Sequence, residues 1–312
     1  MIAFAERVRG ARRVLVLGIG GGGDVVGSLA LARRCEELGT PFALGGVAWE
    51  RFVIDPHPGP RSTAEIVGGR RIGEHAVLAG PATTTPEGVP FSESHVAGHL
   101  GAETVLIDVT GGARGAAEGI AAAAAELGCD LVLYADVGGD ALAVGTEAGL
   151  ASPLCDAVML AAALRLEPEL PGIASVLGPG CDGELTVEEV FGRIAALARA
   201  GAWIDTWSLG RAIADDVERA ALASHTEASM LLVRCARGEV GEAEIRGGRR
   251  HVALGPLGAL AFSFDLDASA GELPLARAVM QEAGIEAART ALERLGIRTE
   301  LDYERSRARE GP

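Results

Sequence analysis

The feature that most constrains this chain is a repeated pattern in which a short apolar run ends in glycine and an acid. Five such segments lie in the first 185 of its 312 residues. They read VLVLGIGGGGD, FALGGVAWE, VLIDVTGG, LVLYADVGGD and IASVLGPGCDGE. In an open parallel α/β sheet, ligands bind outside the carboxyl ends of the strands. The pattern therefore predicts a row of glycines and carboxylates at one edge of such a sheet.

Helical stretches separate these apolar runs. The first run ends at Gly18 and is followed by VVGSLALARRCEELG, which has helical spacing, and then by a second strand-like run. The alternation resumes after an irregular segment rich in Pro and Gly at residues 50–92. We expect an α/β fold, a Rossmann-like doubly wound and mainly parallel sheet, with a C-terminal α+β extension. Residues 1–205 would form the ligand-binding core, and 50–92 would be an insertion in it.

The last third of the chain has a different pattern. Residues 206–300 combine helical stretches with the strand-like runs MLLVRCARG, EAEIRGGRRHVALG and ALAFSFD. We expect this α+β portion to pack on the core. The polar residues 301–312 are expected to form a frayed tail.

Charge and apolar patterning narrow the class of partner. The chain has 43 acidic and 28 basic residues and a net charge of -15, which argues against nucleic acid or an anionic membrane as partner. Its apolar runs are too short to span a bilayer, and its N-terminus has no clear cleavage site. We therefore expect a cytoplasmic protein whose partner is a small molecule, with a homodimer as the commonest assembly.

The first glycine loop has the sequence Gly20-Gly21-Gly22-Gly23-Asp24 and lies between a predicted strand and a predicted helix. Glycine lets the backbone approach a ligand closely, and a helix N-terminus offers free N–H groups. These residues are therefore candidates for binding a phosphate or carboxylate. A tight turn without a ligand is the structural alternative.

A nucleotide cofactor is a second interpretation of this loop, because Gly18, Gly20 and Gly23 match GxGxxG. Glu50, after the second run, could bind a ribose. Asp24 is unfavourable beside a pyrophosphate unless a metal or an amine lies between them. The cofactor thus stays unknown, and NAD(P) or S-adenosylmethionine is less favoured than Mg²⁺.

Asp108, Asp136 and Asp140 follow later strand-like runs and are the candidate catalytic residues. Converging carboxylates can serve as a general base or hold a divalent cation. Without a His or Cys cluster, oxygen ligands favour Mg²⁺, with Asp24, Asp136 and Asp140 as its ligands. Each Asp could instead cap a helix or stabilise a turn. We expect these acids to converge in one crevice with Asp182.

Other candidates for ligand binding lie close to these segments. Arg51 and Arg61, in a rigid Pro-rich segment, could clamp an anion, although Arg51 could simply pair with Glu50. Asp156 is expected to serve the first turn of a helix. The remaining candidates are small or acidic residues in the strand-end loops. They are Thr110, Gly138, Gly139, Glu147 and Asp182.

Read together, GIGGGGDVVG, GGVAWERFVIDPHPGPRS, DVTGG, YADVGGDALAVG and ASPLCDAVML resemble the domain-of-unknown-function 1152 family. The resemblance implies a cytoplasmic, Rossmann-like protein and brings no catalytic residue with it.

Three hypotheses about function follow from the candidate residues. The first is an enzyme acting on a small anionic, phosphorylated or nucleotide-like metabolite, by Mg-dependent transfer or hydrolysis. The second is an enzyme that uses NAD(P) or S-adenosylmethionine. The third is a protein that binds a metabolite without catalysis.

Overall fold

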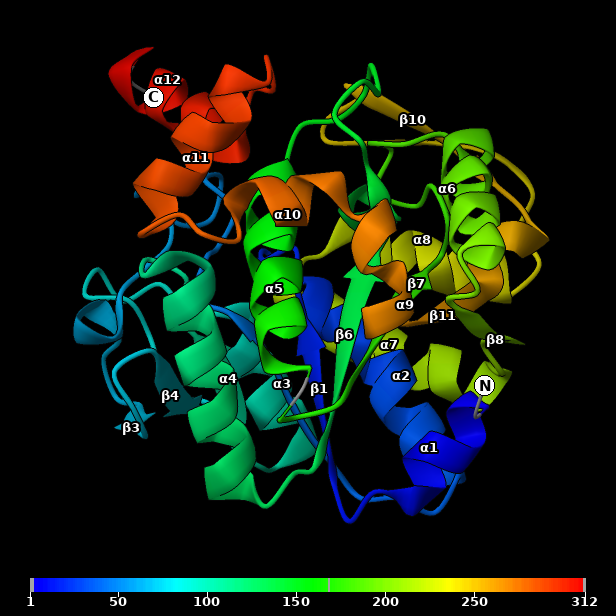
Figure 1. Cartoon of the computed structure of the whole chain (residues 1–312), viewed down its shortest axis with the longest axis horizontal. Coiled ribbons are helices and arrows are strands. Elements are labelled where there is room, and N and C mark those ends of the chain that lie inside the picture. The colour runs from blue at the N-terminus through cyan, green and yellow to red at the C-terminus, as the bar shows by residue number, and fades with distance from the viewer. Residues whose placement is uncertain (1–2, 168, 311–312) are drawn as a thin grey trace.

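A nine-stranded sheet forms the centre of the molecule in the computed structural model, which describes residues 3–167 and 169–310 (Figure 1). The strands lie in the order β3-β4-β5-β2-β1-β6-β7-β11-β8, and β9 and β10 form a separate two-stranded sheet. Their bounds are β1 (Val14–Gly18), β2 (Phe42–Val47), β3 (Arg70–Arg71), β4 (Ala76–Ala79), β5 (Thr104–Ile107), β6 (Leu131–Val137), β7 (Gly172–Leu177), β8 (Trp203–Ser208), β9 (Gly241–Ile245), β10 (Arg250–Leu254) and β11 (Leu260–Asp265).

The five middle strands, β5, β2, β1, β6 and β7, run parallel. Val16 in β1 is in register with Leu44 on one side and Leu133 on the other. After β1 the chain first adds strands on one side, β2 and then β5, and later on the other side, β6 and β7. The loops after β1 and β6 therefore diverge, and a crevice is expected there. The predicted α/β class with a mostly parallel sheet is confirmed.

Helices cover both faces of the sheet. Along β1, Leu15 and Leu17 belong to the core on one face and Val14 and Val16 to the core on the other, as the two-residue period of a strand requires. The helices are α1 (Phe4–Gly10), α2 (Asp24–Glu37), α3 (Ser92–Leu100), α4 (Gly112–Leu127), α5 (Pro153–Leu166), α6 (Val187–Arg199), α7 (Arg211–Ser224), α8 (Glu227–Ala236), α9 (Leu266–Ser269), α10 (Pro274–Val279), α11 (Ile285–Arg294) and α12 (Glu300–Glu310). The short 3-10 turns are η1 (Thr63–Glu65), η2 (Asp140–Leu142), η3 (Pro256–Ala259) and η4 (Ala270–Glu272).

Helix α5 is buried on nearly all sides. Its sequence PLCDAVMLAAALRL is apolar around the whole circumference, and it packs against α4 and α10. The Cys155 thiol at its first turn donates a hydrogen bond of 3.1 Å to the carbonyl of Ile19 in the loop after β1. The N-terminus of α5 therefore faces the carboxyl edge of the sheet (Figure 1).

The insertion at 50–92 and the C-terminal portion both extend the sheet. β3 and β4 come from the insertion and add antiparallel strands at one edge, beside β5. β11 and β8 add two antiparallel strands beside β7 at the other edge. The C-terminal portion is thus built into the main sheet as well as packed on it.

Two predictions about the C-terminal third are wrong. MLLVRCARG, expected as a strand, belongs mostly to helix α8, because Leu231, Leu232 and Cys235 lie on a buried helical face; a short apolar run does not distinguish the two structures. The expected frayed tail forms helix α12, which is held by buried Leu301 and by Glu304. Residues 311–312 of that tail lie outside the described residues.

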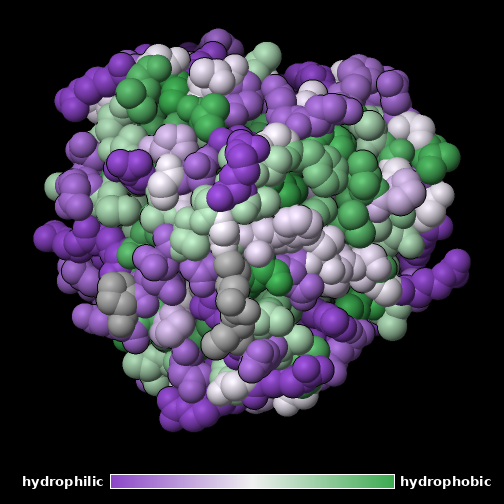
Figure 2. Space-filling model, turned by 45° about the vertical axis from the view of Figure 1, so that its right-hand side comes forward, coloured by the Kyte–Doolittle hydropathy of each residue, from purple (hydrophilic) through white to green (hydrophobic). Residues whose placement is uncertain are grey.

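Three observations describe the surface and the thiols of the described residues. Among the described residues, no helix has the length and apolar character needed to cross a membrane. Figure 2 shows apolar side chains in small groups bordered by hydrophilic ones. All five cysteines are buried free thiols.

Candidate functional site

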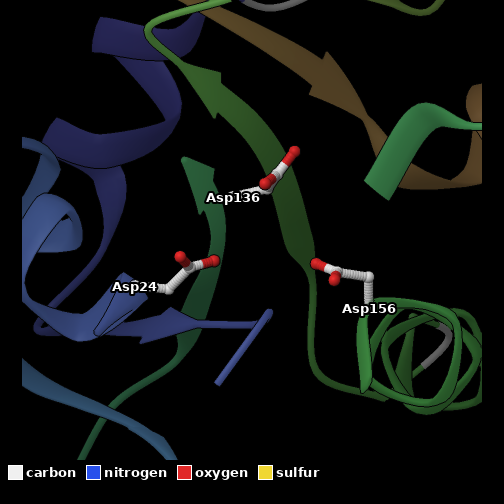
Figure 3. A group of neighbouring side chains, drawn as sticks. All are labelled: Asp24, Asp136 and Asp156. Carbon is white, nitrogen blue, oxygen red and sulfur yellow. The ribbon is translucent and has the colours of Figure 1, made fainter. Parts of the chain in front are cut away.

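Three carboxylates from three different elements meet near the carboxyl ends of β1 and β6 (Figure 3). Asp24 is the first residue of α2, Asp136 lies near the end of β6, and Asp156 lies in the first turn of α5. One oxygen of each carboxylate lies within 4.8 Å of the others. We call these residues the first acid group. Asp136 and Asp156 are each 1% exposed, whereas Asp24 keeps some contact with solvent.

Glycine is required at the centre of the first acid group. A methyl group added to Gly20 would lie 2.7 Å from Oδ2 of Asp24 and 3.3 Å from Oδ2 of Asp156. The Gly20 N–H donates a hydrogen bond of 3.0 Å to Asp24. The absence of a side chain at Gly20 thus leaves room for the carboxylates of both Asp24 and Asp156 beside the backbone.

Two of the three carboxylates in the first acid group have no hydrogen-bond donor in the described chain. Within the described part of the chain, both side-chain oxygens of Asp136 and both of Asp156 are buried without a hydrogen-bond partner. Burial raises the pKa of Asp24 to about 7, and burial with neighbouring carboxylates raises the pKa values of Asp136 and Asp156 well above the ordinary range. Such groups need either protons or a cation.

A second acid group lies beside the first and consists of Asp140, Asp182 and Glu184. Glu184 accepts hydrogen bonds from the N–H groups of Ala151 and Ser152, and an arginine, Arg250, lies 3.0 Å from its Oε1. Both oxygens of Asp182 lack a partner among the described residues, and burial raises its pKa to about 8.

Arginines border both acid groups. Arg51 lies against the glycine loop, since a methyl group on Gly22 would lie 2.6 Å from its Cγ. Arg246 and Arg250 come from the turn and second strand of the β9–β10 hairpin and are 24% and 20% exposed. Sequence reasoning missed both hairpin arginines. The signal was the basic turn RGGRR, which we interpreted only as a turn between strands.

The glycine loop has the backbone that its sequence predicts, with positive φ at Gly21, Gly22 and Gly23. Three of its N–H groups are used inside the protein, among them that of Asp24, which donates to the carbonyl of Gly21 at 3.2 Å. Gly20 donates to Asp24, and Gly22 donates to the carbonyl of Trp49 at 2.8 Å. Whether the loop binds an anion stays a prediction, with Arg51 beside it as the cationic partner.

Convergence of the predicted acids is partial. Asp24, Asp136, Asp140 and Asp182 come together, but Asp108 belongs to neither acid group. Its carboxylate accepts from the N–H groups of Thr63 and Thr110, each at 2.8 Å, and from the Thr110 hydroxyl. Asp108 and Thr110 therefore stabilise a turn. A strand followed by an acid and glycines has the same local sequence pattern in such a turn as in a binding site.

Three other candidates have partners away from the first acid group. Arg61 forms a buried pair with Asp55, through two hydrogen bonds of 2.8 Å. The carboxylate of Glu147 accepts three N–H groups of its own loop. Glu50 is buried and accepts the N–H of Ser92.

Gly138 and Gly139, the two remaining glycine candidates, leave room for neighbouring side chains. A methyl group on Gly138 would lie 2.2 Å from Cγ of Asp182, so this glycine lets Asp182 enter the site. A methyl group on Gly139 would lie 2.8 Å from a methyl of Val190, so this glycine serves packing.

Asp156 is the acid that sequence reasoning placed differently. It does lie in the first turn of α5, as expected, but it is buried and points toward Asp24 and Asp136 (Figure 3). The metal set predicted from sequence, Asp24, Asp136 and Asp140, thus contains two residues of the first acid group and one of the second. The sequence feature that could have placed Asp156 in the site is an acid in the first turn of a helix that is otherwise apolar except for Arg165.

The model of one protein family matches residues 15–308. The chain belongs to the family described as Protein of unknown function (DUF1152). No curated protein matches it, and no solved structure does. The match confirms the resemblance that the glycine and aspartate segments indicated, and the inference of function rests on the site.

Proposed function

We propose that this protein is a divalent-cation-dependent enzyme that acts on a small phosphorylated or nucleotide-like metabolite, by transfer or hydrolysis. The observation that carries the proposal is the first acid group. Asp136 and Asp156 offer four buried oxygens without partners in the described part of the chain, and a hard cation prefers such ligands. Buried carboxylates without hydrogen-bond donors lower the stability of the folded protein. Groups that lower stability in this way occur preferentially in functional sites.

The strand order also supports the proposal. If β1, β2, β5, β6 and β7 are numbered in chain order, the parallel strands read 3-2-1-4-5, the order of the Rossmann-like fold that binds nucleotides at its switch point. The first acid group lies at the corresponding place, between β1 and β6.

Each residue would have a separate role. Asp24, Asp136 and Asp156 would hold Mg²⁺, which supplies charge stabilisation at a phosphoryl oxygen when bound. Arg51 would bind the phosphate through its guanidinium. Asp182, with a pKa raised to about 8 and no partner in the described chain, would accept or donate a proton.

The proposal is tested by assaying turnover of nucleotides and sugar phosphates with Mg²⁺ or Mn²⁺, using phosphate release and product mass. Asp136→Asn is expected to abolish the metal-dependent reaction. Glu188→Gln, an exposed acid on α6, makes the same charge change and should leave the reaction unaltered. Turnover that survives Asp136→Asn would overturn the proposal, and saturable thermal stabilisation without turnover would favour a binding protein instead.

Location, assembly and a nucleotide cofactor are further proposals. Free buried cysteines suit the reducing cytoplasm, and fractionation of cells tests this. Light scattering tests the homodimer. A mass spectrum of the purified protein tests for bound NAD(P) or S-adenosylmethionine.

A further inference from the structure

Two arginines from distant parts of the chain, Arg51 and Arg246, lie near the first acid group, and the guanidinium of neither one donates a hydrogen bond to an acid in the described chain. We propose that Arg51 and Arg246 form a phosphate subsite between the N-termini of α2 and α8. The inference deepens the proposed function, since the subsite would hold a phosphate of the same metabolite. It does not need the cation, so the two can be tested separately.

Arg51 lies between two helix starts. Gly23 caps α2, which has 14 residues, and Thr226 caps α8, which has 10. A methyl group on Gly23 would lie 3.5 Å from Nη2 of Arg51 and 3.0 Å from Oγ1 of Thr226. The guanidinium is therefore close to the N–H groups of both first turns, which attract anions.

Arg246 approaches the same place from the β9–β10 hairpin. Its backbone N–H donates to the Glu227 carboxylate in the first turn of α8, at 3.1 and 3.2 Å. Its φ is 56°, in the left-handed region that favours glycine. Gly247 and Gly248 follow directly. A glycine at position 246 would adopt this φ with less conformational strain than the arginine does. An unfavourable backbone that keeps a particular side chain indicates a function for it.

The two guanidinium groups keep unused hydrogen-bond donors, although acids lie in their surroundings: Asp24, Glu50 and Glu227 act on Arg51. In the described chain, Arg51 has no acid within ion-pair distance and its side chain donates no hydrogen bond. The nearest acid to Arg246 is Glu227, with Nη1 and Oε2 3.7 Å apart, too far for a hydrogen bond. Burial and the charge of Arg246 lower the pKa of Arg51 to about 10, so the two cations destabilise each other.

Phosphate is the anion that best fits these donors. Two guanidinium forks offer more N–H groups than one carboxylate can accept, and a phosphate dianion has three terminal oxygens. At the start of α2 the N–H groups of Asp24 and Val26 already donate to the carbonyls of Gly21 and Gly23, so the arginines are the main donors. Arg51 lies against Gly22 and Gly23, directly before Asp24 of the first acid group, so the subsite lies at the border of that group. A phosphate here would lie next to the proposed cation.

The test is titration of inorganic phosphate into the whole protein with EDTA present, followed by calorimetry. The native protein is expected to bind one phosphate per chain, and Arg246→Gln and Arg51→Gln should each weaken it about tenfold or more, the usual cost of losing a charged hydrogen bond. Arg234→Gln removes the same charge from the far end of α8 and should change affinity less than twofold, because salt screens distant charges.

Two results would overturn the subsite. They are no phosphate binding by the folded native protein, or equal weakening by Arg246→Gln and Arg234→Gln. Circular dichroism of each variant shows whether it is folded, and Arg246→Lys keeps the charge if Gln prevents folding. Mn²⁺ titration without phosphate separates this inference from the proposed function, because Arg246→Gln should still bind Mn²⁺. A nucleoside monophosphate that competes with phosphate would extend the subsite to organic phosphates.

Discussion

The two neighbouring acid groups each bring three carboxylates together, but they differ in what surrounds them. In the second group, Glu184 accepts two backbone N–H groups and lies 3.0 Å from Nη1 of Arg250. In the first group, neither Asp136 nor Asp156 has a hydrogen-bond partner in the described chain. Each group thus keeps buried carboxylates without partners in the described chain, but only the second has a guanidinium in close contact with one of its acids, and the first group has two adjoining unpartnered acids, Asp136 and Asp156. A count of acids alone would not distinguish a structural cluster from a binding site.

The largest effect is expected at Asp156. Asp156→Asn removes one of three ligands, so Mn²⁺ affinity should fall about 100-fold or more, while the metal-free protein should gain about 1 kcal/mol because a buried repulsion is removed. Calorimetric titration and urea unfolding measure the two quantities. Asp140→Asn, in the second acid group, is the matched variant. Equal losses of affinity in both variants would mean that the two groups do not differ.

Glu184 should show the opposite behaviour. Glu184→Gln leaves Arg250 without its acid, and we expect a loss of about 2 kcal/mol in the free energy of unfolding, less than for a fully buried pair because Arg250 is partly exposed. Mn²⁺ affinity should change little. Urea unfolding with EDTA present measures the loss. A gain in stability would indicate that Arg250 and the backbone N–H groups do not offset the cost of burying the Glu184 carboxylate.

Stability of the metal-free protein should fall as pH rises. The folded-state pKa values of Asp24, Asp182 and Glu300 are raised to about 7, 8 and 8. A raised pKa means that the folded state holds the proton more strongly than the unfolded state, so its stabilising effect is lost as pH rises through the folded pKa. Thermal unfolding from pH 5 to 8 should therefore show a falling Tm with EDTA and a smaller fall with Mg²⁺. Identical curves would contradict this expectation.

The smallest effect is expected at Asp108, which accepts three hydrogen bonds in its turn. Asp108→Asn should cost about 1 kcal/mol of stability and leave Mn²⁺ affinity unchanged. Chemical unfolding and the same metal titration check this. A marked loss of metal affinity would place Asp108 in the site after all.

The sequence predicted the sheet edge better than it predicted the site. The strand-and-glycine pattern fixes where Asp24 and Asp136 lie, since Asp136 lies near the end of a regular strand and Asp24 begins the helix after a strand and its glycine loop. The same pattern at Asp108 leads to a closed turn, because the donors come from Thr63, distant in sequence, and from Thr110. Asp156, Arg246 and Arg250 were missed because their positions depend on how α5 and a C-terminal hairpin pack on that edge. Local sequence patterns predict helices and strands. The residues that pair with a buried acid are determined by tertiary contacts, which local patterns do not show.

The most direct test of the central claim is anomalous diffraction from crystals soaked in Mn²⁺. We expect one peak bound by oxygens of Asp24, Asp136 and Asp156, at about 2.1 Å from each. A peak at Asp140, Asp182 and Glu184 alone, or no peak between the three aspartates at saturating Mn²⁺, would contradict the account.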